Sequence, residues 1–194
     1  MTTTMTTYPQ DLPADEIDLA HEACANAEAF GELYRRHVTR VYRYHMAHTG
    51  NVKDAEDLTS QTFMAALEGI RSFRGTGSFA AWLLGIAARK KAMFFRWSAI
   101  RTEVPIEAAH QIPSPNLGTD HLASQRLRLD AITRALKQIS PERADAVALC
   151  FFSELTYAEA GLVLKKSEAA AKMLVTRGLQ DLRERTSLVF EVEL

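Results

Sequence analysis

The chain has 194 residues, of which 47% are hydrophobic and 24% charged, enough to build the core of one domain or of two small ones. Its net charge of −1 excludes a uniformly basic nucleic-acid-binding protein, so any such function must depend on local charge. No apolar run reaches the length of a membrane span and the N-terminus lacks the pattern of a signal peptide, so we expect a cytoplasmic protein with no membrane segment of its own.

The first half of the chain predicts a tail followed by a block of helices. Residues 1–14 are expected to form a flexible tail, and the first helical block is expected over residues 15–101. Apolar residues spaced three and four apart predict helices over Ala27–Ala47 and Val52–Ile70, and Gly50 ends the first of them. The inner side of the second helix is expected to carry Ala55, Thr59, Thr62, Phe63, Ala66 and Ile70.

A third helix and a linker come next. Ser78 follows a loop that contains two glycines, and it can cap a helix that ends near Trp97. Residues 102–121 contain three prolines and one glycine and show no clear periodicity. This composition is typical of an extended, mobile connection.

The remaining residues, 122–194, predict a second helical block. Helices are expected over Leu122–Ile139, Pro141–Phe152, Thr156–Leu164 and Ser167–Arg185. No stretch of useful length shows the alternation of a strand. The predicted fold class is therefore all-α, with two small helical domains joined by a flexible linker.

The last two predicted helices have the form of a helix-turn-helix. Thr156 and Glu159 fit a capping box, a Lys165-Lys166 turn follows, and Ser167 can cap the second helix. The apolar residues that would hold the two helices together are Tyr157, Ala160, Leu162, Val163, Leu174, Val175, Leu179 and Leu182. The outer face of the second helix carries Glu168, Lys172, Thr176 and Arg177. Lysine, arginine and threonine can meet phosphates or base edges, although an ordinary helical hairpin would show the same spacing.

The segment from residue 71 to residue 101 is basic and aromatic. Its seven basic residues are Arg71, Arg74, Arg89, Lys90, Lys91, Arg96 and Arg101, and it contains no acidic residue. Its aromatic residues are Phe73, Phe79, Trp82, Phe94, Phe95 and Trp97. Because basic charge holds a phosphate backbone and aromatic faces stack on unpaired bases, the segment suits single-stranded or melting DNA. Core packing is the other explanation for its apolar residues, Trp82 in particular.

The second helix carries a stripe opposite its apolar side. The stripe consists of Asp54, Asp57, Gln61, Met64 and Glu68, spaced three and four apart. Composition alone favours a solvated face. An acidic stripe that contains a methionine can also dock a basic helical partner.

The sequence indicates no catalytic or metal site. It has no phosphate loop or nucleophile elbow, so we expect neither an enzyme nor a cofactor. His37, His45 and His48 could share a helix face, but no cysteine or acidic ligand accompanies them at a metal-binding spacing, and surface histidines are expected. Cys24 and Cys150 lie far apart in apolar stretches and predict reduced core thiols.

Over residues 15–185 these features, in this order, resemble the extracytoplasmic-function sigma factors of the sigma-70 family. The segments that carry the resemblance include Leu33-Tyr34-Arg35-Arg36-His37, Asp54-Ala55-Glu56-Asp57-Leu58, Ala81-Trp82-Leu83-Leu84-Gly85-Ile86-Ala87 and Leu155-Thr156-Tyr157-Ala158-Glu159-Ala160. The resemblance implies an RNA polymerase sigma factor that binds core polymerase and directs promoter recognition and transcription initiation.

The resemblance also implies a role for each block. In the first block, as sigma region 2, the residues facing core polymerase would be Asp54, Asp57, Gln61 and Met64. Those along the minus-ten DNA would be Arg74, Arg89, Lys90, Lys91 and Arg96. In the second block, as sigma region 4, those facing the minus-thirty-five DNA would be Ser167, Lys172, Thr176 and Arg177. Core RNA polymerase and promoter DNA are the expected partners, and an anti-sigma factor, which holds many relatives inactive, is a further candidate.

The sequence departs from the family pattern in both blocks. Ala88-Arg89 and Met93 stand where the family usually has Arg-Asn and an aspartate. Lys165-Lys166 occupies a turn that usually holds a glycine, and the recognition helix begins with Ala169-Ala170-Ala171, which offers few polar atoms. The differences concern base-level contacts and leave the expected architecture unchanged.

Two other functions fit parts of the same pattern. An autonomous helix-turn-helix transcriptional regulator usually dimerises, but the chain has no coiled-coil segment and carries a basic, aromatic block that a repressor would not need. A pure interaction protein would bind polymerase or an anti-sigma partner without supporting transcription.

Overall fold

The computed structural model describes residues 14–102 and 131–191, with side chains for residues 16–100 and 131–185. Every regular element in these ranges is a helix, which confirms the predicted all-α class. The tail before Ala14, the linker beyond Thr102 and the start of the Leu122–Ile139 helix lie outside the described residues. None of the helices that are described is both long and apolar enough to cross a membrane.

The first block is built from helices with well-defined ends. Its elements are α1 (Ala14–Glu22), α2 (Ala27–Thr49), α3 (Val52–Gly69), the 3₁₀ turn η1 (Ile70–Ser72) and α4 (Phe79–Thr102). The side chains of Asn26 and Asn51 accept hydrogen bonds from the first turns of α2 and α3. Gly50 ends α2 in the left-handed conformation, at a φ of 67°. Ser78 caps α4 as predicted, with its Oγ accepting from the Ala81 N–H at 3.1 Å.

The second block contains one departure from the predicted helices. Its labelled elements are α6 (Pro141–Val147), the π-helical turn η2 (Ala148–Phe152), α7 (Tyr157–Leu164) and α8 (Glu168–Glu191), and residues 131–138 before them are also helical. The predicted Pro141–Phe152 helix is divided because the Ser153 N–H bonds to the Ala148 carbonyl at 3.1 Å, five residues back. Glu154 then leaves the turn in the left-handed conformation, at a φ of 57°.

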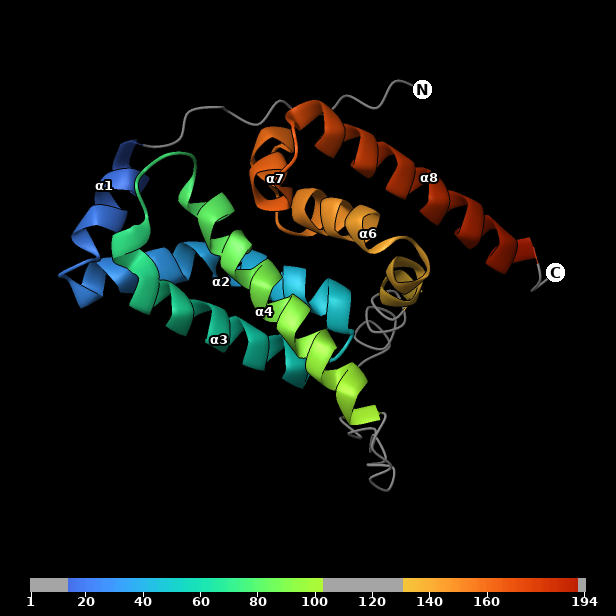
Figure 1. Ribbon diagram of the computed structural model, residues 1–194, viewed down its shortest axis with the longest axis horizontal. Coiled ribbons are helices and arrows are strands. Elements are labelled where there is room, and N and C mark those ends of the chain that lie inside the picture. Colours follow the sequence, from blue (N-terminus) through green and yellow to red (C-terminus); the bar gives the residue numbers. More distant parts are fainter. Residues whose placement is uncertain (1–13, 103–130, 192–194) are drawn as a thin grey trace, which may run out of the picture.

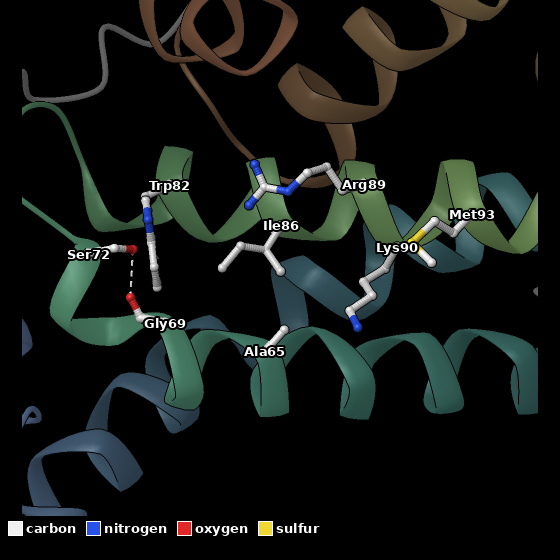
Figure 2. Close-up of a pocket in the computed structure, with 8 residues that line it drawn as sticks. All are labelled: Ala65, Gly69, Ser72, Trp82, Ile86, Arg89, Lys90 and Met93. Carbon is white, nitrogen blue, oxygen red and sulfur yellow. Dashed lines mark hydrogen bonds between the residues drawn. The ribbon is translucent and has the colours of Figure 1, made fainter.

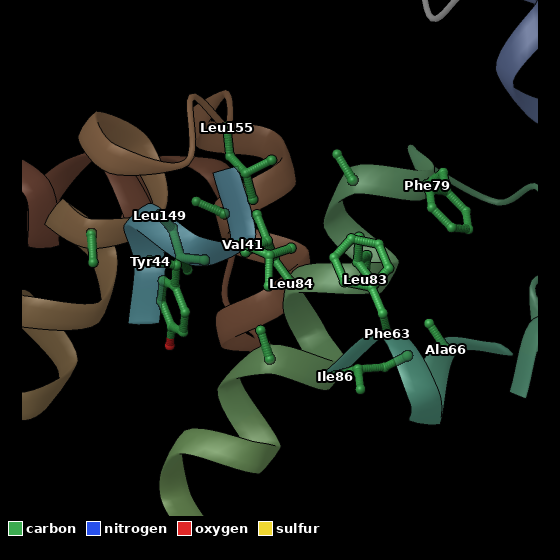
Figure 3. Close-up of a cluster of buried hydrophobic side chains, with 14 of the residues drawn as sticks. Val41, Tyr44, Phe63, Ala66, Phe79, Leu83, Leu84, Ile86, Leu149 and Leu155 are labelled. Atoms are coloured by element: carbon green, nitrogen blue, oxygen red, sulfur yellow. The ribbon is translucent and has the colours of Figure 1, made fainter. Parts of the chain in front are cut away.

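The two blocks pack against each other and share a core. Helices α2, α3 and α4 lie together (Figure 1). The turn η2 contacts α2, α7 contacts α4, and α6 reaches α2 and α4 through Asp145. One cluster of buried side chains runs through both blocks, with Val41, Tyr44 and Leu84 from the first and Leu149 and Leu155 from the second (Figure 3). The predicted inner side of α3 is also buried. The described parts of the chain therefore form one packed unit.

The expectation of surface histidines is wrong for the three that α2 carries. His37 is buried with its Nε2 2.8 Å from the Glu16 carboxylate of α1, and His45 is buried with its Nε2 3.0 Å from the Thr62 hydroxyl. The side chain of His48 is only 9% exposed. Burial lowers the pKa of His45 to about 3, so its ring is neutral at physiological pH. No group of metal-ligating side chains occurs among the residues described.

The two cysteines are free and half-buried. Burial raises the pKa of the Cys150 thiol to about 12, so this thiol is protonated near neutral pH. Cys24, in the turn after α1, points its Sγ at the Ala20 carbonyl, 3.7 Å away. Neither cysteine contributes to the surfaces described below.

Candidate protein and nucleic-acid interfaces

The outer side of α3 carries the predicted acidic stripe. Asp57, Gln61, Met64 and Glu68 are exposed, and Asp54 is half-buried next to the capped N-terminus of the helix. Met64 is 64% exposed, and the neighbouring Leu67 adds a second exposed apolar side chain. Carboxylates around an apolar centre fit a partner helix that has both apolar and basic side chains.

A groove of about 250 Å³ lies between α3 and α4. Its lining residues are Ala65, Gly69, Ser72, Trp82, Ile86, Arg89, Lys90 and Met93. Figure 2 shows Lys90 reaching from α4 towards α3 and Trp82 standing beside Ser72, whose hydroxyl donates to the Gly69 carbonyl at 2.7 Å. The groove thus combines the Trp82 indole with the cations of Arg89 and Lys90. An aromatic ring beside cations suits the binding of a phosphate next to an unstacked base.

The other predicted minus-ten residues lie outside the groove lining. Arg74 is exposed in the loop before α4, and Arg96 is exposed towards the end of α4. Lys91 is turned away from its neighbour Lys90, towards α2 and α6. The sequence placed these cations on one segment, and the structure brings only Arg89 and Lys90 together in the groove.

Lys91 belongs to a charged cluster between the two blocks. Its Nζ forms an ion pair with Asp145 of α6, and its side chain is 12% exposed. The same Asp145 oxygen accepts a hydrogen bond from the Tyr44 hydroxyl at 3.4 Å. The Nε2 of His48 lies 3.2 Å from that oxygen, outside hydrogen-bond alignment. All three groups around Asp145 come from the first block.

The cluster fixes the charge on Asp145. Burial raises the pKa of this carboxyl, but His48 and Lys91 lower it by more, and the resulting pKa is below the ordinary value. Burial lowers the pKa of His48, so its ring is uncharged at neutral pH and Lys91 supplies the balancing charge. Asp145 belongs to none of the patterns that predicted the binding surfaces. Its signal was a lone acid in the apolar run from Ala144 to Phe152.

The helix-turn-helix of α7 and α8 forms as predicted. Thr156 and Glu159 make both hydrogen bonds of a capping box, and the Ser167 hydroxyl accepts from the Ala170 N–H at 3.2 Å. The four predicted contact residues are all exposed at the start and along the outer side of α8: Ser167, Lys172, Thr176 and Arg177. The exposed side chains of Ala169 and Met173 share this surface. The recognition side of α8 is therefore open to a partner.

One apolar residue of the helix-turn-helix lies elsewhere than predicted. Leu162 is 61% exposed and does not pack between α7 and α8. Its methyl group instead lies 3.2 Å from where a β-carbon at Gly77 would stand, beside the loop before α4. Leu162 thus lies on the side of α7 that faces the first block. The spacing of apolar residues in the sequence could not distinguish this side from the side that faces α8.

The turn between α7 and α8 holds a lysine in a glycine conformation. Lys165 ends α7 at a φ of 56° and a ψ of 44°. Replacing it by glycine removes the strain that the left-handed conformation imposes on a residue with a side chain. Glycine loses more chain entropy on folding, which offsets part of this gain, so the free energy of unfolding is expected to rise by about 0.5–1 kcal/mol. Urea denaturation followed by circular dichroism measures the change.

Lys166→Gly is the matched control for this prediction. It removes the same charge from the next position, where φ is not positive, and it also removes an ion pair with Glu142 at 3.3 Å. No gain in stability is expected for Lys166→Gly. An equal gain in both variants would show that loss of charge, and not relief of the backbone, is responsible.

The chain is similar to proteins of known family. Residues 33–98 match the family model described as Sigma-70 region 2, and residues 129–182 match that described as Sigma-70, region 4. The chain is 34% identical to the ECF RNA polymerase sigma factor BldN of Streptomyces coelicolor over 86% of its own length, and it spans 64% of BldN. It is 32% identical to the ECF RNA polymerase sigma factor SigE of Mycolicibacterium smegmatis over 80% of its own length, and it spans 61% of SigE. It is 30% identical to the RNA polymerase sigma factor CarQ of Myxococcus xanthus over 86% of its own length, and it spans 92% of CarQ.

Solved structures show the same fold. CnrH in complex with the cytosolic domain of CnrY matches with a TM-score of 0.67 at 21% identity, over 89% of this chain and 97% of that one. The sigma factor RpoE in complex with the anti-sigma factor NepR from Bartonella quintana matches with a TM-score of 0.62, also at 21% identity, over 81% of this chain and 96% of that one.

Proposed function

The chain belongs to the extracytoplasmic-function sigma factors of the sigma-70 family, and we propose that it is a dissociable specificity subunit of RNA polymerase. It would bind core polymerase and direct it to promoters in the cytoplasm, without catalysing a reaction itself and without a cofactor. The observation that carries the proposal is the combination of surfaces on one chain: an acidic stripe, a cationic and aromatic groove and an open recognition helix.

The first block, residues 15–101, would dock on polymerase and hold the minus-ten region. Asp54, Asp57, Gln61 and Met64 would contact a basic helical surface of the core enzyme. In the groove, Arg89 and Lys90 would neutralise phosphates while the Trp82 indole contacts an unstacked base. The remaining minus-ten contacts would come from Arg74, Lys91 and Arg96.

The second block, residues 122–194, would bind the duplex upstream, joined to the first by the linker 102–121. Ser167, at the N-terminus of α8, and the exposed Lys172, Thr176 and Arg177 would enter the minus-thirty-five major groove. A net charge of −1 suits this role, because polymerase holds both blocks near the promoter at high effective concentration and the free protein needs little DNA affinity. An anti-sigma factor is a further proposed partner, since the similar RpoE was solved with one.

Gel shift and run-off transcription, each with and without core polymerase, test the proposal. Specific promoter binding and transcripts that start at a defined site are expected only when the chain and core polymerase are both present. Tight, specific binding without polymerase would favour an autonomous helix-turn-helix regulator. Binding to polymerase without any transcript would favour a pure interaction protein.

Upstream DNA binding is expected to depend on the cations of α8. Lys172→Ala with Arg177→Ala should weaken the holoenzyme–promoter complex and reduce the slope of log affinity against log salt by roughly two, because each lost phosphate contact removes about one released counterion. Filter binding at several salt concentrations measures the slope, and co-purification checks that polymerase docking persists.

The matched control removes two exposed cations from the helical residues 131–138. Arg134→Ala with Lys137→Ala changes the net charge by the same amount but leaves α8 intact. The salt slope of this control is expected to stay near that of the parent chain. Loss of polymerase docking in the α8 variant would contradict the assignment of docking to the first block and of upstream DNA binding to the second.

A further inference from the structure

Four methionines lie in the part of the chain that the structure describes, and three of them are exposed. Met64 is 64% exposed on α3, Met93 is 48% exposed on α4 and Met173 is 50% exposed on α8. The fourth, Met46, is buried in α2, with 9% of its surface exposed. Each exposed thioether lies on a different one of the three surfaces that the proposed function assigns to a partner.

Two of the exposed methionines lie in the middle of surfaces proposed to be covered by a partner. Met64 lies between Gln61 and Glu68 and is the apolar centre of the acidic stripe. Met173 lies one helical turn before Arg177 on the recognition side of α8. Methionine suits such contacts because its flexible, polarizable thioether adapts to the surface that it meets. A polar group in place of either thioether would be buried when the partner binds.

The third exposed methionine, Met93, lines the groove between α3 and α4 (Figure 2). It lies one helical turn after Arg89 and Lys90, the two cations of the groove. Oxidation of a methionine converts its apolar thioether into a polar sulfoxide, whose oxygen accepts hydrogen bonds. A sulfoxide here would place an acceptor beside the two side chains that are proposed to neutralise phosphates. Oxidation of Met93 would therefore compete with DNA for the cations of the groove.

The two cysteines are poorly placed to react with an oxidant. Burial raises the pKa of the Cys150 thiol to about 12, so almost none of it is the reactive thiolate near neutral pH. Cys24 is half-buried and directs its Sγ at the Ala20 carbonyl. A thioether needs no deprotonation before it is oxidised, so access to its sulfur decides how readily it reacts. The exposed methionines are therefore the accessible sulfur atoms of the described structure.

We propose that Met64, Met93 and Met173 are the sites at which peroxides reversibly inactivate this sigma factor. The sulfur lone pair attacks one peroxide oxygen and the O–O bond breaks. The leaving oxygen takes the proton of the transferred one and departs as water or an alcohol, so the sulfur loses two electrons and the peroxide gains them. Two thiols of a methionine sulfoxide reductase system return the electrons, which releases water and leaves a disulfide. The inference rests on the proposed function, because it takes the three surfaces to bind polymerase and promoter DNA.

Treatment of the free chain with hydrogen peroxide tests the proposal. The chain is oxidised alone, free methionine consumes the remaining peroxide, and core polymerase is then added. Polymerase binding and run-off transcription are each expected to fall at least about tenfold, because a sulfoxide buried against a partner without a hydrogen bond is costly. Peptide mass spectrometry should find the added oxygen at the three exposed sites, while Met46 stays unmodified.

Leucine variants assign the loss to these sites. Met64→Leu with Met93→Leu and Met173→Leu keeps three apolar side chains of similar size and removes the reactive sulfur atoms. For this triple variant, the ratio of transcription after treatment to transcription before treatment is expected to stay near one, whatever its starting level. Met46→Leu is the matched control, and its ratio should fall as in the parent chain. Methionine sulfoxide reductases with dithiothreitol should restore transcription by the oxidised parent chain, and dithiothreitol alone should not.

The outcomes separate the inference from the proposed function. Transcription by the untreated parent chain tests the proposed function, whereas the ratio between treated and untreated protein tests the effect of oxidation. An unchanged ratio in the parent chain, or an equal loss in the triple leucine variant, would overturn the inference and leave the proposed function standing. Recovery with dithiothreitol alone would assign the loss to the cysteines and would overturn it as well.

Discussion

Polymerase binding is expected to be lost when Asp57 is replaced by arginine and Gln61 by alanine in the same chain. Both side chains are exposed on α3, so the change should leave the fold intact. A cation placed against a basic partner surface costs several kcal/mol, and a loss of about 3 kcal/mol corresponds to more than a hundredfold in affinity. Co-purification with core polymerase and a fluorescence titration measure the effect, and circular dichroism checks the helical content.

The same helix supplies a matched control for this variant. Glu56→Arg with Ser60→Ala makes the same charge change at the same spacing, on exposed positions one residue earlier and about 100° round α3. This control is expected to retain polymerase binding. If the Asp57 variant still co-purified with polymerase at the parental level, the acidic stripe would be only a solvated face.

Gly161→Ala is expected to disrupt the helix-turn-helix. A β-carbon at this position would lie 2.8 Å from the Lys166 carbonyl oxygen and 3.3 Å from the Ser167 carbonyl carbon. Both atoms are backbone, so the turn itself would have to move. Overpacking costs about 1–3 kcal/mol, and the better helix propensity of alanine returns up to about 1 kcal/mol. The free energy of unfolding should therefore fall by about 1–2 kcal/mol, and upstream DNA binding should weaken because α8 is displaced.

Gly85→Ala makes the same change in the middle of α4 with the opposite expectation. Apart from its chain neighbours and the backbone of its own helix, no atom lies within 4 Å of the β-carbon that it adds, so the helix propensity of alanine should raise stability by up to about 1 kcal/mol. Chemical denaturation of both variants provides the comparison. Stabilisation by Gly161→Ala would mean that the turn tolerates a side chain and that its close approach does not position α8.

Local patterns determined most of the helices, because their causes lie within a few residues. Asn51, Ser78 and Thr156 each accept a hydrogen bond from the first turn of the helix that follows, and Gly50 takes the left-handed conformation that ends α2. The periodic spacing also identified the buried side of α3, which left the acidic stripe on its outer side. The stripe and the recognition side of α8 were predictable because exposure follows from helical period alone.

The groove and the packing between the two blocks were decided by contacts between segments distant in the chain, which no local pattern contains. Lys90 and Lys91 are adjacent in sequence, yet Lys90 lines the groove with α3 while Lys91 is closed off by Asp145, because neighbours on a helix differ by about 100° in direction. The expectation of surface histidines was wrong because the residues that cover His37 and His48 lie in other helices, α1 and α6.

The sequence by itself thus determined the helices, their caps, the family and the two exposed surfaces proposed to bind partners. Only the tertiary structure decided which cations share a groove and that the two blocks join through Asp145, Glu154 and Glu159. Capping and periodicity act over one or two helical turns. The choice of partner for a charge depends on packing between segments distant in the chain, as in the Lys91–Asp145 pair, whose members lie 54 residues apart.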